Sequence, residues 1–229
     1  NTGQTLRDSV GLVECIDRVE QEMKRLGGSD PFKVKTDPQA PHLRRAWGFS
    51  VAYKNTGLGG GAPDKAGADA ELLRDGTFQV RTSSAELGQG LPTVLRLIAA
   101  EILEQEPEKI SVLLSDTDLT PDGGPTTASR QTFVSGNAVR QAAQALRQMI
   151  TSELAEIYDV APEEIRYIEG LAQVGRHTMT MAETAEKILA SGRTPCASVT
   201  YWAPTTTPLG KGGDMHFAFS FAAQAVEVE

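Results

Sequence analysis

The stretch Ser84-Ala85-Glu86-Leu87-Gly88-Gln89-Gly90-Leu91-Pro92 (residues 84–92) separates a strand pattern from a helix pattern. Before it, residues 77–82 alternate between apolar and polar side chains, as strands do. After it, Pro92 fits the first turn of a helix. Apolar residues then recur at helical spacing, at Leu91, Val94, Leu95, Ile98 and Ile102. A strand, a tight turn and a helix ending at Leu103 are therefore predicted in this order.

The Gly88-Gln89-Gly90 turn is a candidate ligand site. The first N–H groups of a helix have no partners inside it, and together with the helix dipole they favour an anion or a strong acceptor at Gln89 to Leu91. The Gln89 side chain adds an amide that both donates and accepts. The same residues also fit a plain tight connection between a strand and a helix. The turn alone does not decide between these two interpretations.

Composition describes an ordinary globular chain of one or two domains. Its 229 residues are 40% hydrophobic and 23% charged, which is enough to bury a sizeable core. A net charge of −8 without a long basic run argues against nucleic acid and anionic membranes as partners. No apolar run approaches the roughly 20 residues of a membrane span, and the start lacks the pattern of a secretory signal. A cytoplasmic location is expected.

Cysteine and histidine are too sparse to predict a metal centre. Cys15 and Cys196 lie far apart, so neither a disulfide framework nor a local iron–sulfur or zinc site is indicated. The three histidines, His42, His177 and His216, occur singly and are interpreted as structural or surface residues. We predict no metal ligand.

Strand and helix patterns interleave along the chain, which predicts an α+β (mixed α/β) fold. Two segments are expected: an N-terminal helix and linker over residues 1–41, and a larger domain over residues 42–229. The predicted helices are 10–26, with Ser9 as a candidate cap, 91–103, 134–158 and 181–190. The predicted strands are 42–54, 66–73, 77–82, 110–114, a pair within 166–174, 198–203 and 215–228.

Two further expectations concern the first and last strands. The odd positions Trp47, Phe49, Val51 and Tyr53 are expected to face a core. In the last strand, the large residues change parity after Phe221, which predicts a bulge near residues 222–223. Because the chain starts at an asparagine and still reads as a strand at its end, we expect a piece of a longer polypeptide, or alternatively a short edge strand that finishes the chain.

A second polar segment, which begins at Ser115 and includes a long loop over residues 119–130, carries the second candidate site. Its first part, residues 115–124, contains three aspartates, but their spacing fits turn formation better than a calcium loop. In its second part, hydroxyl groups, small residues and Arg130 precede a long helix, and such a set grips phosphate without a net positive charge. A capped helix start, with Ser129 or Ser135 as the cap, is the alternative.

Together the two loops resemble the molybdenum-binding large subunit of the xanthine dehydrogenase and aldehyde oxidase family of molybdenum hydroxylases. The resemblance is carried by Glu86 to Leu91, by Ser115 to Pro121 and by Gly124 to Val139, in this order and spacing. It extends upstream through residues 53–64 and downstream to the last strand. It implies the molybdopterin-binding fold of this family, with mixed sheets packed against helices.

The resemblance also implies residue roles. Gln89 would hydrogen-bond the pterin or its phosphate, and Gly88 and Gly90 would allow close backbone approach. Thr126, Thr127, Ala128 and Ser129 would pass near the metal end and the phosphate, with Ala128 nearest molybdenum. Arg130 and Gln131 would lie on the phosphate or nucleotide side. For Arg130, a salt bridge to a loop aspartate is the structural alternative.

Finally, the resemblance implies an oxidoreductase that oxidatively hydroxylates an aldehyde or an N-heterocycle. Its cofactor would be molybdopterin or molybdopterin cytosine dinucleotide with molybdenum, and its partners the rest of the large subunit and iron–sulfur and FAD domains or subunits. No motif for the catalytic glutamate of the family occurs here, so we predict no catalytic residue, an inactive fragment and no bound cofactor. The alternative is a non-catalytic phosphate- or nucleotide-binding or assembly module.

Overall fold

The computed structural model describes residues 3–8 and 10–229, and the chain forms two compact units. One unit contains the chain up to residue 61 together with residues 206–229, and the other contains residues 62–205. The chain therefore leaves the first unit, builds the second and returns. The sequence boundary after residue 41 stays a prediction.

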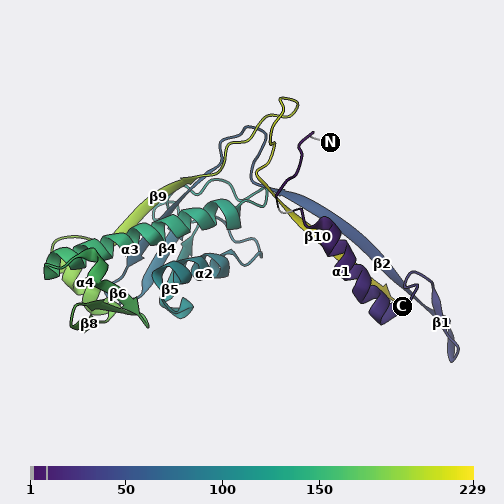
Figure 1. The fold of residues 1–229 in the computed structure, drawn as a ribbon, viewed down its shortest axis with the longest axis horizontal. Coiled ribbons are helices and arrows are strands. Elements are labelled where there is room, and N and C mark those ends of the chain that lie inside the picture. The colour runs from purple at the N-terminus through teal and green to yellow at the C-terminus, as the bar shows by residue number, and fades with distance from the viewer. Residues whose placement is uncertain (1–2, 9) are drawn as a thin grey trace. The chain divides into compact units, whose positions relative to one another are not determined.

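The second unit is built on a four-stranded mixed sheet with the order β5-β4-β3-β9 (Figure 1). Neighbouring strands are antiparallel except for β4 and β5, which run parallel and are connected through a helix, α2. The predicted strands over residues 66–73, 77–82 and 110–114 and the predicted helix over residues 91–103 are confirmed. The bounds are β3 Lys65–Leu72, β4 Phe78–Thr82, α2 Leu91–Leu103, β5 Ile110–Leu114 and β9 Cys196–Trp202.

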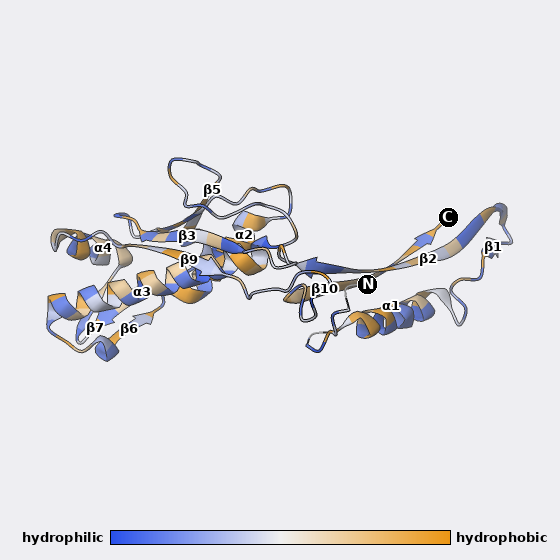
Figure 2. Cartoon of the chain, turned by 90° about the horizontal axis from the view of Figure 1, so that it is seen from above, coloured by the Kyte–Doolittle hydropathy of each residue, from blue (hydrophilic) through white to orange (hydrophobic). Residues whose placement is uncertain are grey.

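A long helix, α3 (Gly136–Tyr158), packs against both the sheet and α2 and contributes much of the core. Its buried face includes Val139, Leu146, Ile150 and Leu154, at helical spacing. Figure 2 shows hydrophobic and hydrophilic positions alternating along α3, as expected for a helix that buries one face. A π-helix, η2 (Gln131–Ser135), leads directly into α3, where the sequence pattern predicts ordinary helix from residue 134.

A small three-stranded sheet and a last helix complete the second unit. The order is β6-β7-β8, with α4 following β8. Thr180 caps α4, because its side chain accepts from the Glu183 N–H at 3.2 Å and the Glu183 carboxylate accepts from the Thr180 N–H at 2.7 Å. The bounds are β6 Ile165–Ile168, β7 Leu171–Val174, β8 His177–Met179 and α4 Met181–Ala190, with short 3-10 turns at η1 Pro107–Lys109 and η3 Pro162–Glu164.

The first unit is a three-stranded sheet with the order β1-β2-β10, in which β2 and β10 form a long ribbon, and one helix packs on this ribbon. Its elements are α1 Leu12–Gly27, β1 Lys35–Asp37, β2 Ala40–Thr56 and β10 Ala218–Val228. Strand β1 pairs with the start of β2, and β10 pairs with the rest of it. Ser9, the predicted cap of α1, lies outside the described residues.

Two expectations for the ribbon are wrong. The register between β2 and β10 runs without a shift from Ala218 opposite Thr56 to Val228 opposite Ala46, so no bulge occurs at residues 222–223. The change of parity instead leaves Val226 and Val228 exposed on the other face. Of the four odd positions predicted to face a core, Phe49, Val51 and Tyr53 are exposed, up to 65% for Tyr53, whereas Trp47 is half-buried.

The mixed-sheet α+β class is thus confirmed. No helix among residues 3–8 and 10–229 is both long and apolar enough to cross a membrane.

Candidate functional site

Helix α2 starts at the Gly88-Gln89-Gly90 turn, which follows the end of β4 at Thr82 after a short connecting segment. Gly90 caps α2 with a φ of 77°, and Gly88 has a φ of 102°. A side chain at either position would meet no atom within 4 Å, so the backbone conformation, and not a lack of space, requires glycine here. The turn is exposed on its outer side.

The anion expected at the start of α2 is a carboxylate of the chain itself. One oxygen of Glu86 accepts from the Gly88 N–H at 2.6 Å and from the Gly90 N–H at 3.1 Å. The other accepts from the Leu91 N–H at 2.5 Å. Desolvation is the largest single influence on the pKa of Glu86 and raises it, but the N–H donors of Gly90, Gly88 and Leu91 outweigh it, so the pKa is lowered.

Gln89 is engaged within the same turn. Its Nε2 donates to the Ala85 carbonyl at 3.0 Å, and its Oε1 accepts from the Leu87 N–H at 2.6 Å. The amide therefore braces residues 85–89 while the residue remains exposed.

The second loop has a strained backbone where Thr126 to Ser129 pass before η2. Ala128 and Ser129 adopt φ values of 52° and 53°. The turn that they form is closed by a hydrogen bond of 3.2 Å from the Arg130 N–H to the Thr127 carbonyl. A left-handed conformation costs a residue with a side chain about 1–2 kcal/mol, and such strain gathers at functional sites. Thr127 and Ser129 are exposed, and Thr126 and Ala128 are half-buried.

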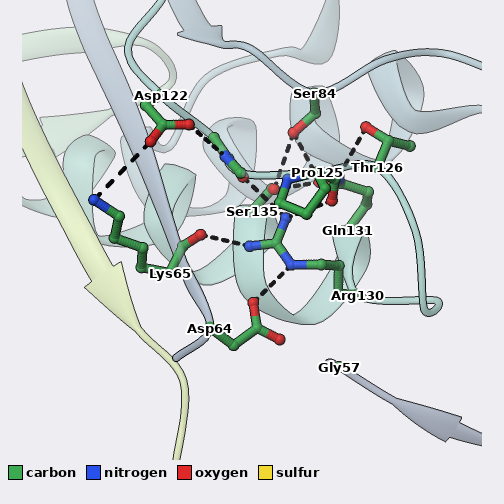
Figure 3. A network of polar contacts seen from close by, with 12 residues as sticks. Gly57, Asp64, Lys65, Ser84, Asp122, Pro125, Thr126, Arg130, Gln131 and Ser135 are labelled. Carbon is green, nitrogen blue, oxygen red and sulfur yellow. Dashed lines mark hydrogen bonds and ion pairs between the residues drawn. The ribbon is translucent and has the colours of Figure 1, made fainter. Parts of the chain in front are cut away.

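A buried polar network joins the two loops (Figure 3). The Gln131 Oε1 accepts from Ser84 Oγ at 2.7 Å and also from Ser135 Oγ, and the two serine hydroxyls lie 3.0 Å apart. The Gln131 Nε2 donates to Thr126 Oγ1 at 3.0 Å. Thr126 Oγ1 in turn accepts from the Ala85 N–H at 2.8 Å. The segment just before the Gly-Gln-Gly turn is thereby fixed to the second loop.

The π-helix carries Gln131, the side chain that bonds to residues of both loops. Gln131 and Ser135 are its first and last residues, and the two side chains bond to each other from there. π-helical turns occur frequently at functional sites. Ser135 precedes α3 in the cap position, but its side chain makes no capping bond, because its hydroxyl belongs to the network.

Arg130 lies beneath the second loop and is completely buried. Its Nε donates to Asp64 Oδ1 at 2.7 Å, and its other nitrogens donate to the carbonyls of Gly123 and Pro125, both at 2.9 Å, and of Lys65 at 2.5 Å. A salt bridge to an aspartate is therefore formed, but the aspartate comes from the glycine-rich segment 56–64 and not from the loop over residues 115–124. Arg130 shapes the loop that carries Thr126 to Ser129.

Two of the loop aspartates, Asp116 and Asp122, act as turn formers. The Asp116 carboxylate accepts from the N–H groups of Asp118 and Leu119, and Asp122 accepts from the Gly124 N–H at 2.9 Å. Within the part of the chain that the structure describes, no group of three or more His, Cys, Asp and Glu side chains could hold a metal ion.

The arrangement is suited to holding a ligand rich in hydrogen-bonding groups. Its exposed residues include Gln89, Thr127 and Ser129, which are uncharged, and the negative charge of the exposed Glu86 is held by the N–H groups at the start of α2. Buried hydrogen bonds already fix the backbone of both loops, so a ligand that binds there needs to order little of the chain.

Sequence reasoning missed the residues that hold the site together. Ser84 and Asp64 are buried polar residues that bond to Gln131 and Arg130. Ser84 is separated from Gln131 by 47 positions. Glu86 gave a local signal, because a glutamate just before a helix start is well placed to accept from its first N–H groups.

Comparison with known proteins agrees with these features. A family model for a molybdopterin cofactor-binding domain matches residues 27–229. A probable xanthine dehydrogenase component of Bacillus subtilis is 30% identical over 200 residues, which cover 87% of this chain and 26% of that protein. The aldehyde oxidoreductase of Megalodesulfovibrio gigas is 37% identical over 117 residues, which cover 50% of this chain and 13% of that protein.

Solved structures show the same fold. The aldehyde oxidoreductase from Desulfovibrio desulfuricans matches 99% of this chain and 22% of its own with a TM-score of 0.66 and 26% identity. Quinoline 2-oxidoreductase from Pseudomonas putida matches 98% of this chain and 29% of its own with a TM-score of 0.69 and 21% identity. This likeness shows the fold alone.

The chain spans about a quarter or less of the length of the two curated relatives described above. The match to the family model covers most of the chain and includes both loops. The resemblance inferred from those loops is confirmed, and the chain belongs to the molybdopterin cofactor-binding domain family.

Proposed function

We propose that this chain forms part of the cradle for molybdopterin in the molybdenum-binding subunit of a hydroxylase of the xanthine dehydrogenase and aldehyde oxidase type. The observation that carries the proposal is the buried network through Gln131, which holds the two family motifs against each other. The reaction would be the oxidative hydroxylation of an aldehyde or an N-heterocycle in the cytoplasm. The cofactor would supply the redox chemistry of molybdenum.

Within this proposal the residues of the chain bind and orient. Gln89, with Gly88 and Gly90 beside it, forms one side of the cradle, and the other side contains Thr126, Thr127, Ala128 and Ser129. The donor set fits a pterin, whose ring edge offers several N–H and carbonyl groups to uncharged partners. Gln131 and Arg130 support the cradle from its buried side, because both are buried and donate to carbonyls of the loop, Gln131 to Pro125 and Arg130 to Gly123 and Pro125.

The chain would work together with the rest of the large subunit and with iron–sulfur and FAD domains or subunits. The exposed side chains of Phe49, Val51 and Tyr53 on β2 support a packing partner, since neighbouring exposed apolar residues often mark interaction surfaces. The cofactor would be the mononucleotide or the cytosine dinucleotide form. The isolated chain would not turn over substrate.

The test is the variant Gln89→Ala in the complete molybdenum-binding subunit. Loss of a polar contact of about 1–3 kcal/mol should lower the retention of cofactor about 5- to 150-fold. Molybdenum and pterin content per protein would be measured alongside turnover. Gln148→Ala, an exposed glutamine on α3, is the matched control and should leave both unchanged. Full cofactor content in the Gln89 variant would refute its assignment.

A further inference from the structure

The start of α2 already holds a negatively charged group. Both oxygens of Glu86 are used there, and together they accept from the N–H groups of Gly88, Gly90 and Leu91. The helix is 13 residues long, so its N-terminus carries the usual partial positive charge. At other helix starts, free N–H groups attract phosphate. Here these groups already bond to the carboxylate of Glu86, which precedes them by two to five residues in the sequence.

The Gln89 side chain complements this arrangement. Its oxygen accepts from the Leu87 N–H, so side-chain oxygens engage the N–H groups of residues 87, 88, 90 and 91. A phosphate entering the turn would have to displace Glu86 from three donors and would also meet its negative charge. Both effects act against phosphate.

We propose that Glu86 is a positioning residue that closes the start of α2 to phosphate and holds the Gly88-Gln89-Gly90 turn in shape, so that this side of the cradle receives a neutral heterocycle. The second half of this statement rests on the proposed function. It assigns the turn to the pterin ring of the cofactor. The phosphate would then lie elsewhere, outside the reach of the α2 N-terminus.

The first experiment needs no cofactor. The backbone amide signals of the ¹⁵N-labelled 229-residue chain would be followed by NMR during titration with inorganic phosphate. In the unmodified chain, Gly88, Gly90 and Leu91 should not shift. In Glu86→Ala, the same three amides should shift saturably, and their hydrogen exchange should be about fivefold faster before phosphate is added.

Two further variants separate this effect from general destabilisation. Glu101→Ala removes another exposed glutamate from the same helix and should leave the three amides unchanged. Glu86→Gln keeps the size of the side chain and one acceptor oxygen, so it serves if the alanine variant does not fold. It should lose part of the protection of these amides. Acetate should restore protection in Glu86→Ala, and neutral acetamide should not.

Phosphate shifts of equal size in the unmodified chain, or unchanged exchange in Glu86→Ala, would overturn the proposal. The second experiment compares molybdenum and pterin content in the complete molybdenum-binding protein. Glu86→Ala should lose cofactor at least fivefold relative to Glu101→Ala. A protein that keeps its cofactor although the turn has opened refutes the link to the pterin and leaves the proposed function intact. An unmodified protein without pterin refutes the proposed function itself, while the amide data still decide whether Glu86 closes the turn.

Discussion

At the scale of single residues, the site depends on two charged side chains, Glu86 and Arg130, that lie in opposite environments. Glu86 is exposed and is stabilised by backbone N–H groups, whereas Arg130 is completely buried and is stabilised by a carboxylate and three carbonyls. The first shapes the Gly-Gln-Gly turn, and the second shapes the loop opposite. Neither one needs to touch the cofactor to decide where the other residues lie.

The variant Asp64→Asn tests the buried pair. Because Arg130 and Asp64 side chains are 0% and 3% exposed, removal of one charge leaves the other buried without its partner, and we expect a loss of about 3–5 kcal/mol. Urea denaturation measures this loss. The exposed pair of Arg18 and Glu14 provides the control, since Glu14→Gln should change the stability by less than about 1 kcal/mol. Equal small effects would show that the Arg130 charge does not depend on Asp64.

At the scale of elements, the sequence predicts what local patterns determine. Helices α2 and α4 begin and end at the predicted residues, because apolar spacing, Pro92 and the Thr180 cap are all local signals. The short strands β1 and β8 are missed, since three residues carry too little pattern. The π-helix and the contact between Ser84 and Gln131 depend on tertiary packing, so the sequence could place the two loops in the site without showing how they are joined.

The packing of the second loop against the end of β4 also gives a prediction. A side chain at Gly123 would come within 2.6 Å of Thr82 Oγ1 and 3.2 Å of the Ser83 nitrogen. Gly123→Ala should therefore push the loop away and cost about 1–3 kcal/mol of folding free energy. At Gly48 in β2 the nearest atom lies 4.0 Å away, so Gly48→Ala is the control and should be neutral or slightly stabilising. A Gly123 variant as stable as this control would contradict the close packing.

At the scale of the whole molecule, the two compact units differ in how much core they possess. Among the described residues, Met23 is the buried hydrophobic side chain of the first unit, whereas the buried side chains of α2, α3, α4 and the mixed sheet all lie in residues 62–205. Two-stranded ribbons are marginally stable in water by themselves. The ribbon of β2 and β10 therefore depends on its packing against α1.

The two tryptophans of the chain allow this difference to be measured, because Trp47 belongs to the first unit and Trp202 to the second. Trp202→Phe leaves a fluorescent probe on β2, and Trp47→Phe leaves one on β9. In urea, the Trp47 signal should change at a lower concentration than the Trp202 signal, since less apolar surface is buried around the ribbon. Circular dichroism of both variants, which is dominated by the larger unit, should follow Trp202. Coincident midpoints for the two probes would mean that the ribbon unfolds together with residues 62–205 as one cooperative unit.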